Sequence, residues 1–167
     1  MRYRENNMST QDNLNHVTKD IPSGEGMRFG IVVSDWNAVV TSALEKGAFE
    51  TLTGHGVIPG DIKVIHVPGS FELPLGGQFL AETETFDAII LLGCVIQGET
   101  RHFDFVCQGV TQGTMDLNLK FDIPFLFGVL TTDNLQQALD RSGGRLGNKG
   151  SDVALAAIQM GALKRSL

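Results

Sequence analysis

The residues best placed for acid–base chemistry lie where an apolar run ends and a helical pattern begins. The run over residues 88–96 has the length and β-branched content of a buried strand, and Gly98 then releases the chain into a pattern of helical period. Thr100 is expected to cap this helix, which places His102 in its first turn. A neutral histidine at a helix start can take up a proton and return it. The alternative interpretation is that His102 is only a polar residue at a helix start.

A second candidate group surrounds a glycine-rich stretch near the C-terminus. Arg141, Arg145 and Lys149 lie in or beside residues 142–150, and a helical pattern follows. The stretch lacks the glycine, lysine and hydroxyl spacing of a P-loop, so no nucleoside triphosphate site is predicted. Positive side chains at a helix start suit a single phosphate group. A solvated loop is the alternative interpretation.

Two other expected strand ends carry side chains that suit a flat, hydrogen-bonding ligand. Trp36 is the only tryptophan, and it follows the apolar run over residues 28–34. Its ring can stack on a heterocycle, although tryptophan is also an ordinary core residue. Glu72 follows the turn over residues 68–70, where a carboxylate can accept hydrogen bonds from a ligand or stabilise a helix start. No set of residues has the spacing of catalytic metal ligands, so no metal site is predicted.

Short apolar strands alternating with helices must position these residues. The expected strands span residues 28–34, 61–67, 88–96 and 123–130, and the later helices begin near residue 71 or 72, after 98, and span 135–141 and 151–163. This alternation is typical of a parallel sheet covered on both faces. We therefore predict an α/β fold, a flavodoxin-like three-layer α/β/α sandwich with a four-stranded parallel sheet. Ligands bind such sheets at the carboxyl ends of the strands, where the candidate residues lie.

Length and composition favour one domain and exclude several classes of partner. The chain has 167 residues, 42% of them apolar, and a net charge of −6. It has no basic cluster interleaved with aromatics, so no nucleic acid partner is predicted. No apolar run reaches the length of a membrane span, and the N-terminus lacks a signal-peptide pattern, so we expect no membrane association and a cytoplasmic location. Cys94 and Cys107 are interpreted as buried thiols.

The first 26 residues differ from the rest of the chain. They are polar, rich in Asn, and interrupted by Pro22, Gly24 and Gly26. Such a segment buries too little apolar surface to join a core. We predict a flexible N-terminal arm over residues 1–26, with any order supplied by a neighbouring chain, and one domain over residues 27–167.

Five motifs, in this order along the chain, resemble the 6,7-dimethyl-8-ribityllumazine synthase family. They lie at residues 29–37, 67–74, 98–106, 127–131 and 141–150. The resemblance implies a lumazine synthase domain over residues 27–167. It also implies a transferase of riboflavin biosynthesis that condenses 5-amino-6-(D-ribitylamino)uracil with 3,4-dihydroxy-2-butanone 4-phosphate and needs no cofactor.

The resemblance implies a role for each site residue. His102 would be the catalytic proton carrier, and Trp36 would stack on the pyrimidine. The residues implied to hold the uracil ring and ribityl chain are Trp36, Ser70, Phe71, Glu72, Cys94, Val95, Ile96 and Phe127. Those implied to bind the phosphate are Glu99, through its backbone N–H, Thr100, Arg141 and Lys149. In the family, Phe127, Arg141 and Lys149 would reach the site from the adjacent subunit.

The resemblance further implies a homopentamer whose subunits share their sites. The short, glycine-rich turn over residues 143–148 is similar to that of members forming an icosahedral shell of 60 subunits, for which a riboflavin synthase is a candidate partner. Two alternatives stay open. One is an archaeal-type riboflavin synthase, which is a related enzyme, and the other is a flavin-binding or shell-forming protein without catalysis.

Overall fold

The structure is a computed structural model, and it describes residues 20–167. Its framework is a four-stranded, all-parallel sheet in the order β2-β1-β3-β4. The strands are β1 (Phe29–Ser34), β2 (Ile62–Val67), β3 (Ala88–Ile96) and β4 (Phe125–Thr132). The helices are α2 (Ala38–Gly54), α3 (Leu73–Thr83), α4 (His102–Lys120), α5 (Leu135–Arg141) and α6 (Lys149–Ser166), with short 3-10 turns η1 (Pro59–Asp61) and η2 (Ser70–Glu72). The predicted fold class is confirmed.

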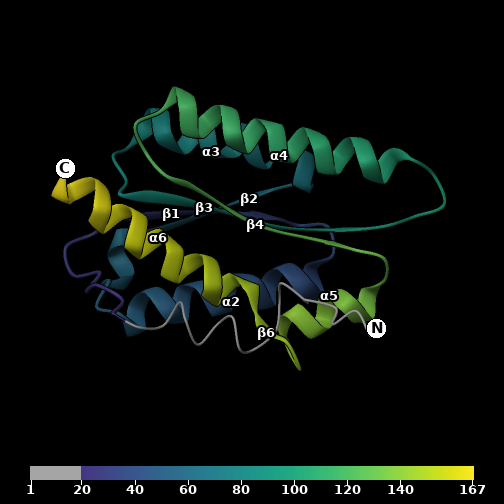
Figure 1. The fold of residues 1–167 in the computed structure, drawn as a ribbon, viewed down its shortest axis with the longest axis horizontal. Coiled ribbons are helices and arrows are strands. Elements are labelled where there is room, and N and C mark those ends of the chain that lie inside the picture. Colours follow the sequence, from purple (N-terminus) through teal and green to yellow (C-terminus); the bar gives the residue numbers. More distant parts are fainter. Residues whose placement is uncertain (1–19) are drawn as a thin grey trace, which may run out of the picture.

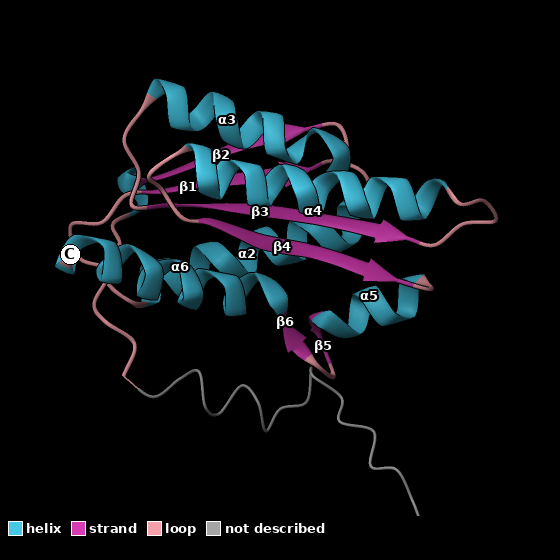
Figure 2. Ribbon diagram, turned by 45° about the horizontal axis from the view of Figure 1, so that its top comes forward, coloured by secondary structure: helices cyan, strands magenta, loops and turns pink. Residues whose placement is uncertain are grey.

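Helices cover both faces of the sheet, so the molecule has three layers. The pair α3 and α4 lies on one face, whereas α2 and α6 lie on the other (Figure 1). The turned view shows the two helical layers separated by the sheet, with α5 near the end of β4 on the α2 and α6 side (Figure 2). Because the helices cover the faces of the sheet, the loops at the ends of the strands remain uncovered by the two helical layers.

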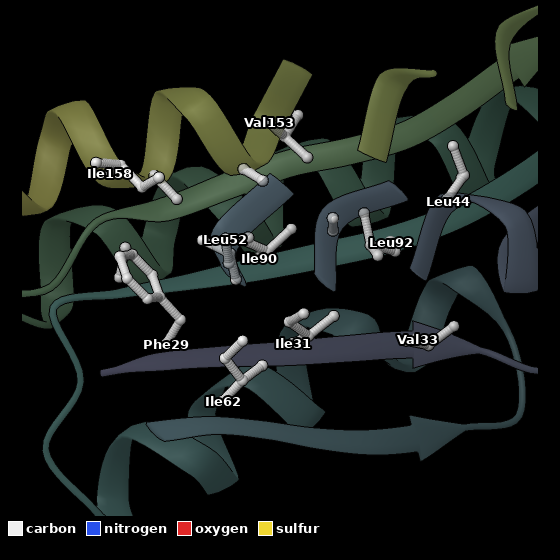
Figure 3. Close-up of a cluster of buried hydrophobic side chains, with 14 of the residues drawn as sticks. Phe29, Ile31, Val33, Leu44, Leu52, Ile62, Ile90, Leu92, Val153 and Ile158 are labelled. Carbon is white, nitrogen blue, oxygen red and sulfur yellow. The ribbon is translucent and has the colours of Figure 1, made fainter. Parts of the chain in front are cut away.

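Alternation of side chains along each strand supplies a core on both faces of the sheet. On one face, Phe29, Ile31 and Val33 of β1 pack toward α2 and α6 (Figure 3). On the other, Val32 of β1 and Leu91 of β3 pack with residues of α3 and α4. Burial of each such side chain stabilises the fold by roughly 1.5–3 kcal/mol. The strands are therefore held rigidly, and the loops at their ends start from fixed positions.

The sheet divides at its carboxyl end between β1 and β3. The paired register of these two strands ends at Val33 and Leu92, whereas β3 continues beside β4 as far as Ile96 and Thr132. Successive connections leave β1 and β3 toward opposite faces, because α2 and α4 lie on opposite sides of the sheet. Such a switch point opens a crevice that commonly binds ligands in α/β proteins.

Strand β4 lies two residues further along the chain than predicted. The apolar run begins at Ile123, but pairing with β3 begins at Phe125 and continues through the polar Thr131 and Thr132. The bounds of β4 follow the length of its partner strand rather than its own hydrophobicity.

The glycine-rich stretch over residues 142–150 is not a plain loop. It forms a small antiparallel hairpin from β5 (Ser142–Gly144) and β6 (Gly147–Asn148). Helix α6 then begins at Lys149, earlier than the predicted residue 151, because the Asn148 side chain accepts a hydrogen bond from the Gly150 N–H at 2.8 Å.

The described part of the predicted arm lies against the body of the same chain. Residues 1–19 of the arm lie outside the described residues. The Gly24 N–H donates to the His55 carbonyl at 2.7 Å, and Arg165 Nη2 donates to the Gly26 carbonyl at 2.7 Å. Gly24 and Gly26 therefore find hydrogen-bond partners without a neighbouring chain.

Candidate active site

A cavity of about 420 Å³ lies at the carboxyl ends of β1, β2 and β3. Three loops that are distant in sequence meet there because strand order places their strands side by side. The lining residues are Trp36, Asn37, Ser70, Phe71, Glu72, Cys94, Val95, Ile96, His102, Phe105 and Val106. The structure thus brings together eight of the residues predicted for the site: Trp36, Ser70, Phe71, Glu72, Cys94, Val95, Ile96 and His102.

Trp36 is a cavity residue and not part of the core. It is 68% exposed, and its backbone N–H donates to the Pro68 carbonyl at 3.1 Å, which ties the turn after β1 to the turn after β2. A Cβ atom at Gly69 would lie 3.0 Å from the indole ring and 3.0 Å from Glu72 Oε2. Glycine at this position lets the ring and the carboxylate approach the same side of the loop. Trp36 therefore lines the cavity with an exposed indole.

Ser70 of the turn η2 lines the cavity and carries a buried hydroxyl group. Ser70 is buried, and its Oγ has no hydrogen-bond partner within the described residues. The group fits against β3 only because residue 93 is glycine: a Cβ there would lie 2.6 Å from Ser70 Oγ and 2.8 Å from Leu73 Cδ1. A buried polar group without a partner is costly, so this hydroxyl is well suited to a ligand's hydrogen bond.

The end of β3 forms an apolar wall. Burial raises the pKa of the Cys94 thiol to about 11, so the group is uncharged near neutral pH and is a poor nucleophile. Val95 and Ile96 are partly exposed at the same edge, whereas the strand from Ala88 to Leu92 is fully buried. Cys94 thus contributes shape and not covalent chemistry.

His102 is the first residue of α4, and its side chain reaches the cavity wall. The predicted cap at Thr100 is wrong by one residue, because the N-cap position is Arg101. Thr100 Oγ1 nevertheless accepts a hydrogen bond from the His102 N–H at 3.4 Å, a long bond to the first free N–H of the helix. His102 is exposed, so a proton on its ring can exchange with ligand or solvent.

The remaining predicted residues do not line this cavity within one chain. Phe127 lies on β4 with its side chain 38% exposed, and Glu99 and Thr100 lie in the exposed loop before α4. Arg141 ends α5, where its Nη1 donates to the Gln137 carbonyl at 3.2 Å. Lys149 pairs with Asp152 at 2.8 Å.

Fixed charges hold the hairpin that follows Arg141. Asp140 is buried, and its carboxylate accepts from Gln136 Nε2 at 2.9 Å and from Arg145 Nε at 2.7 Å. The Gln136 hydrogen bond, assisted by Arg145, lowers the pKa of Asp140. The Leu146 N–H also donates to the Asp140 carbonyl at 2.8 Å. Asp140 therefore links helix α5 to the turn between β5 and β6, close to Arg141.

Comparison with known proteins identifies the family. The chain matches the family model for 6,7-dimethyl-8-ribityllumazine synthase over residues 26–165. The chain belongs to this family. The protein of that name from Parabacteroides distasonis is 56% identical over 140 residues, covering 84% of this chain and 88% of the relative. The one from Flavobacterium johnsoniae is 52% identical, covering 95% of this chain and 84% of the relative. The one from Cytophaga hutchinsonii is also 52% identical, covering 92% of this chain and 97% of the relative.

Three cavity residues of this lumazine synthase family member lie outside the predicted set. Phe105 and Val106 follow His102 by three and four positions, so helical spacing places them on the same side of α4. That spacing was visible in the sequence. Asn37 also lines the cavity, and its only sequence signal is its position directly after Trp36 at a strand end.

Two further features concern the side chains and helices of residues 20–167. No group of three or more His, Cys, Asp or Glu side chains within them is arranged to hold a metal ion. None of the helices in that part of the chain is both long and apolar enough to cross a membrane.

Proposed function

We propose that this chain condenses 5-amino-6-(D-ribitylamino)uracil with 3,4-dihydroxy-2-butanone 4-phosphate. The products are 6,7-dimethyl-8-ribityllumazine, phosphate and water, and the reaction belongs to riboflavin biosynthesis. The observation that carries the proposal is the cavity in which Trp36, Glu72 and His102 meet from three separate loops, in a chain of the lumazine synthase family.

The aminouracil binds in the part of the cavity formed by the ends of β1, β2 and β3. Trp36 stacks on the pyrimidine ring, because its indole is exposed beside the cavity. Ser70 and Glu72 supply the polar contacts, since the Ser70 hydroxyl is buried without a partner among the described residues and the Glu72 carboxylate accepts N–H or O–H donors. Phe71, Cys94, Val95 and Ile96 complete the wall around the ring and the ribityl chain.

His102 moves the protons of the reaction. The amine nitrogen of the uracil attacks the ketone carbon, and the new C–N bond becomes an imine when the carbinol oxygen leaves as water. His102 takes the proton that the nitrogen loses and returns it to the departing hydroxyl. Removal of the proton from the carbon that bears the neighbouring hydroxyl then expels phosphate from the terminal carbon with the C–O bonding pair, and the resulting enol takes up a proton to become a methyl ketone. The ribitylamino nitrogen attacks this ketone, and loss of a second water closes the lumazine ring. The amine is itself nucleophilic, so positioning of both substrates supplies much of the rate.

The phosphate-binding half of the site comes from two subunits of a homopentamer. The loop with Glu99 and Thr100 supplies backbone N–H groups from one subunit, while Arg141 and Lys149 come from its neighbour. The same neighbour places the ring of Phe127 against the uracil and ribityl part of the site. This arrangement is supported by the position of these three residues outside the cavity of their own chain. Exposed apolar side chains on the α3 and α4 layer, which suit burial against a second copy, also support it: Phe71, Leu75, Phe79, Phe105, Met115 and Leu119.

We propose that pentamers close into an icosahedral shell of 60 subunits in the cytoplasm, with a riboflavin synthase as a candidate partner. Light scattering at micromolar protein tests the assembly. A monomer or dimer that turns over both substrates contradicts the shared site, whereas a stable active pentamer contradicts only the shell.

The activity is tested by mixing purified protein with both substrates and following the lumazine product by mass spectrometry. Formation of one phosphate per lumazine is expected. Incubation with the lumazine alone distinguishes the first alternative, because an archaeal-type riboflavin synthase would form riboflavin from it. Absence of turnover with both substrates would instead favour a flavin-binding or shell-forming protein without catalysis.

A further inference from the structure

We infer that Asn37 is a positioning residue, which holds the Trp36 ring over the cavity by bridging the separated ends of β1 and β3. The inference rests on the proposed function only in that Trp36 stacks on the uracil ring. It depends on three observations: the backbone conformation of Asn37, the partner of its side chain, and the weak packing of Trp36.

The backbone of Asn37 is left-handed, with φ 62° and ψ 44°. Within residues 20–167, the only other residue besides glycine with positive φ is Asp20. Asparagine tolerates this conformation better than most residues, but the conformation still has an energetic cost. Such a conformation persists where surrounding structure imposes it, and it often occurs at functional sites.

The Asn37 side chain is directed across the sheet and does not cap its own helix. Asn37 occupies the N-cap position of α2, yet its side chain makes no capping hydrogen bond. Its Nδ2 instead donates to the Cys94 carbonyl at 2.9 Å, 57 residues away. The registered pairs of β1 and β3 end at Val33 and Leu92, so this hydrogen bond lies beyond the last of them. Asn37 thus connects the two strands where their own pairing has ended.

Trp36 needs such a connection because it is held by little else. The ring is 68% exposed, so core packing does not fix it. On the β2 side, the Asp35 N–H donates to the Val67 carbonyl at 2.8 Å and the Trp36 N–H donates to the Pro68 carbonyl at 3.1 Å. On the β3 side, the Asn37 amide provides the hydrogen bond. The turn carrying the indole is therefore anchored on both sides of the crevice.

The decisive variant is Asn37→Gly, because glycine adopts the left-handed conformation freely while the amide is removed. The matched control is Asp20→Gly, which changes the other left-handed residue and does not line the cavity. A second variant, Asn37→Asp, keeps the size of the side chain but replaces the donor with a carboxylate that cannot donate to the Cys94 carbonyl. Circular dichroism and thermal unfolding establish that each variant is folded.

Two readouts separate positioning from a purely structural role. Trp36 is the only tryptophan, so the anisotropy decay of selectively excited tryptophan fluorescence reports on this ring alone. In Asn37→Gly we expect a larger fast, local component of that decay. We also expect a roughly fivefold higher KM for the aminouracil, the factor that corresponds to one hydrogen bond of about 1 kcal/mol. The kcat and the KM for the butanone phosphate stay within about twofold, because the variant loses aminouracil binding that is equally strong in the ground state and the transition state. Asn37→Asp shows at least the same changes, and Asp20→Gly shows neither.

The inference is overturned if Asn37→Gly and Asp20→Gly match the unmodified protein in both readouts, because Asn37 is then only a turn residue. Equal losses for both substrates overturn it as well, since they indicate general disruption of the site. A folded, unmodified protein that turns over neither substrate contradicts the proposed function alone. In that case the anisotropy of Trp36 still decides whether Asn37 holds the ring.

Discussion

The close approach of η2 to β3 allows a quantitative test of how the cavity is built, through Gly93→Ala. The added Cβ would lie 2.6 Å from Ser70 Oγ and 2.8 Å from Leu73 Cδ1, and both neighbours are buried. Overpacking of this kind destabilises a protein by about 1–3 kcal/mol. For a chain of this length, the expected fall in Tm is roughly 2–12 °C. The displaced Ser70 hydroxyl is also expected to raise the KM for the aminouracil.

A double-mutant cycle identifies the atom responsible. Ser70→Ala removes a buried hydroxyl that has no partner within the described residues, so its own effect on the free energy of unfolding is expected to be below about 1 kcal/mol. Combined with Gly93→Ala, it removes the closest contact, although the contact with Leu73 remains. The double variant is therefore expected to be more stable than the sum of the single effects by about 0.5 kcal/mol or more.

Urea unfolding measures each free energy, at one protein concentration because the apparent stability of an oligomer depends on concentration. Gly60→Ala is the matched control, since a Cβ there has no atom within 4 Å and the expected change is within about 0.5 kcal/mol. If Gly93→Ala is as stable as Gly60→Ala, the close packing of η2 against β3 is not real. Strict additivity in the cycle would instead rule out the Ser70 hydroxyl as the source of the strain.

Three further predictions concern catalysis and the phosphate end of the site. His102→Ala should lower kcat by roughly two to four powers of ten while leaving Tm within a few degrees, because the side chain is exposed. Unchanged turnover in stopped-flow or steady-state assays would show that His102 has no part in the mechanism. Arg141→Ala should raise the KM for the butanone phosphate far more than the Kd for the aminouracil, and equal losses would mean that Arg141 supports the fold or the interface. The hydrogen bond from Gln136, together with Arg145, lowers the pKa of Asp140 below its ordinary 3.8 in the folded state. The ionised Asp140 carboxylate therefore contributes to the stability of the fold above pH 3.8, and this contribution is lost as the pH falls through the lowered pKa. Unfolding measured from pH 5 to pH 3 should therefore depend on pH less steeply in Asp140→Asn than in the unmodified protein, and identical slopes would contradict this role.

The sequence by itself determined the elements whose signal is local. The apolar, β-branched run over Ala88–Ile96 is a strand with the predicted bounds, and Leu135–Arg141 is a helix with the predicted bounds. The alternation of such elements restricts the chain to a parallel sheet covered on both faces, because crossover connections between parallel strands place the helices there. The nature of the cavity side chains could be predicted for the same reason: residues directly after parallel strands gather at one edge of the sheet.

Tertiary structure decided the features that depend on a partner distant in sequence. Strand β4 extends to Thr132 because β3 pairs with it that far, which the hydrophobicity of β4 alone does not encode. Gly93 is required because Ser70 packs on it, and Asn37 lines the cavity because its amide reaches Cys94. Local sequence records the preference of a residue for a conformation, whereas these positions are set by which strand ends become neighbours when the sheet forms.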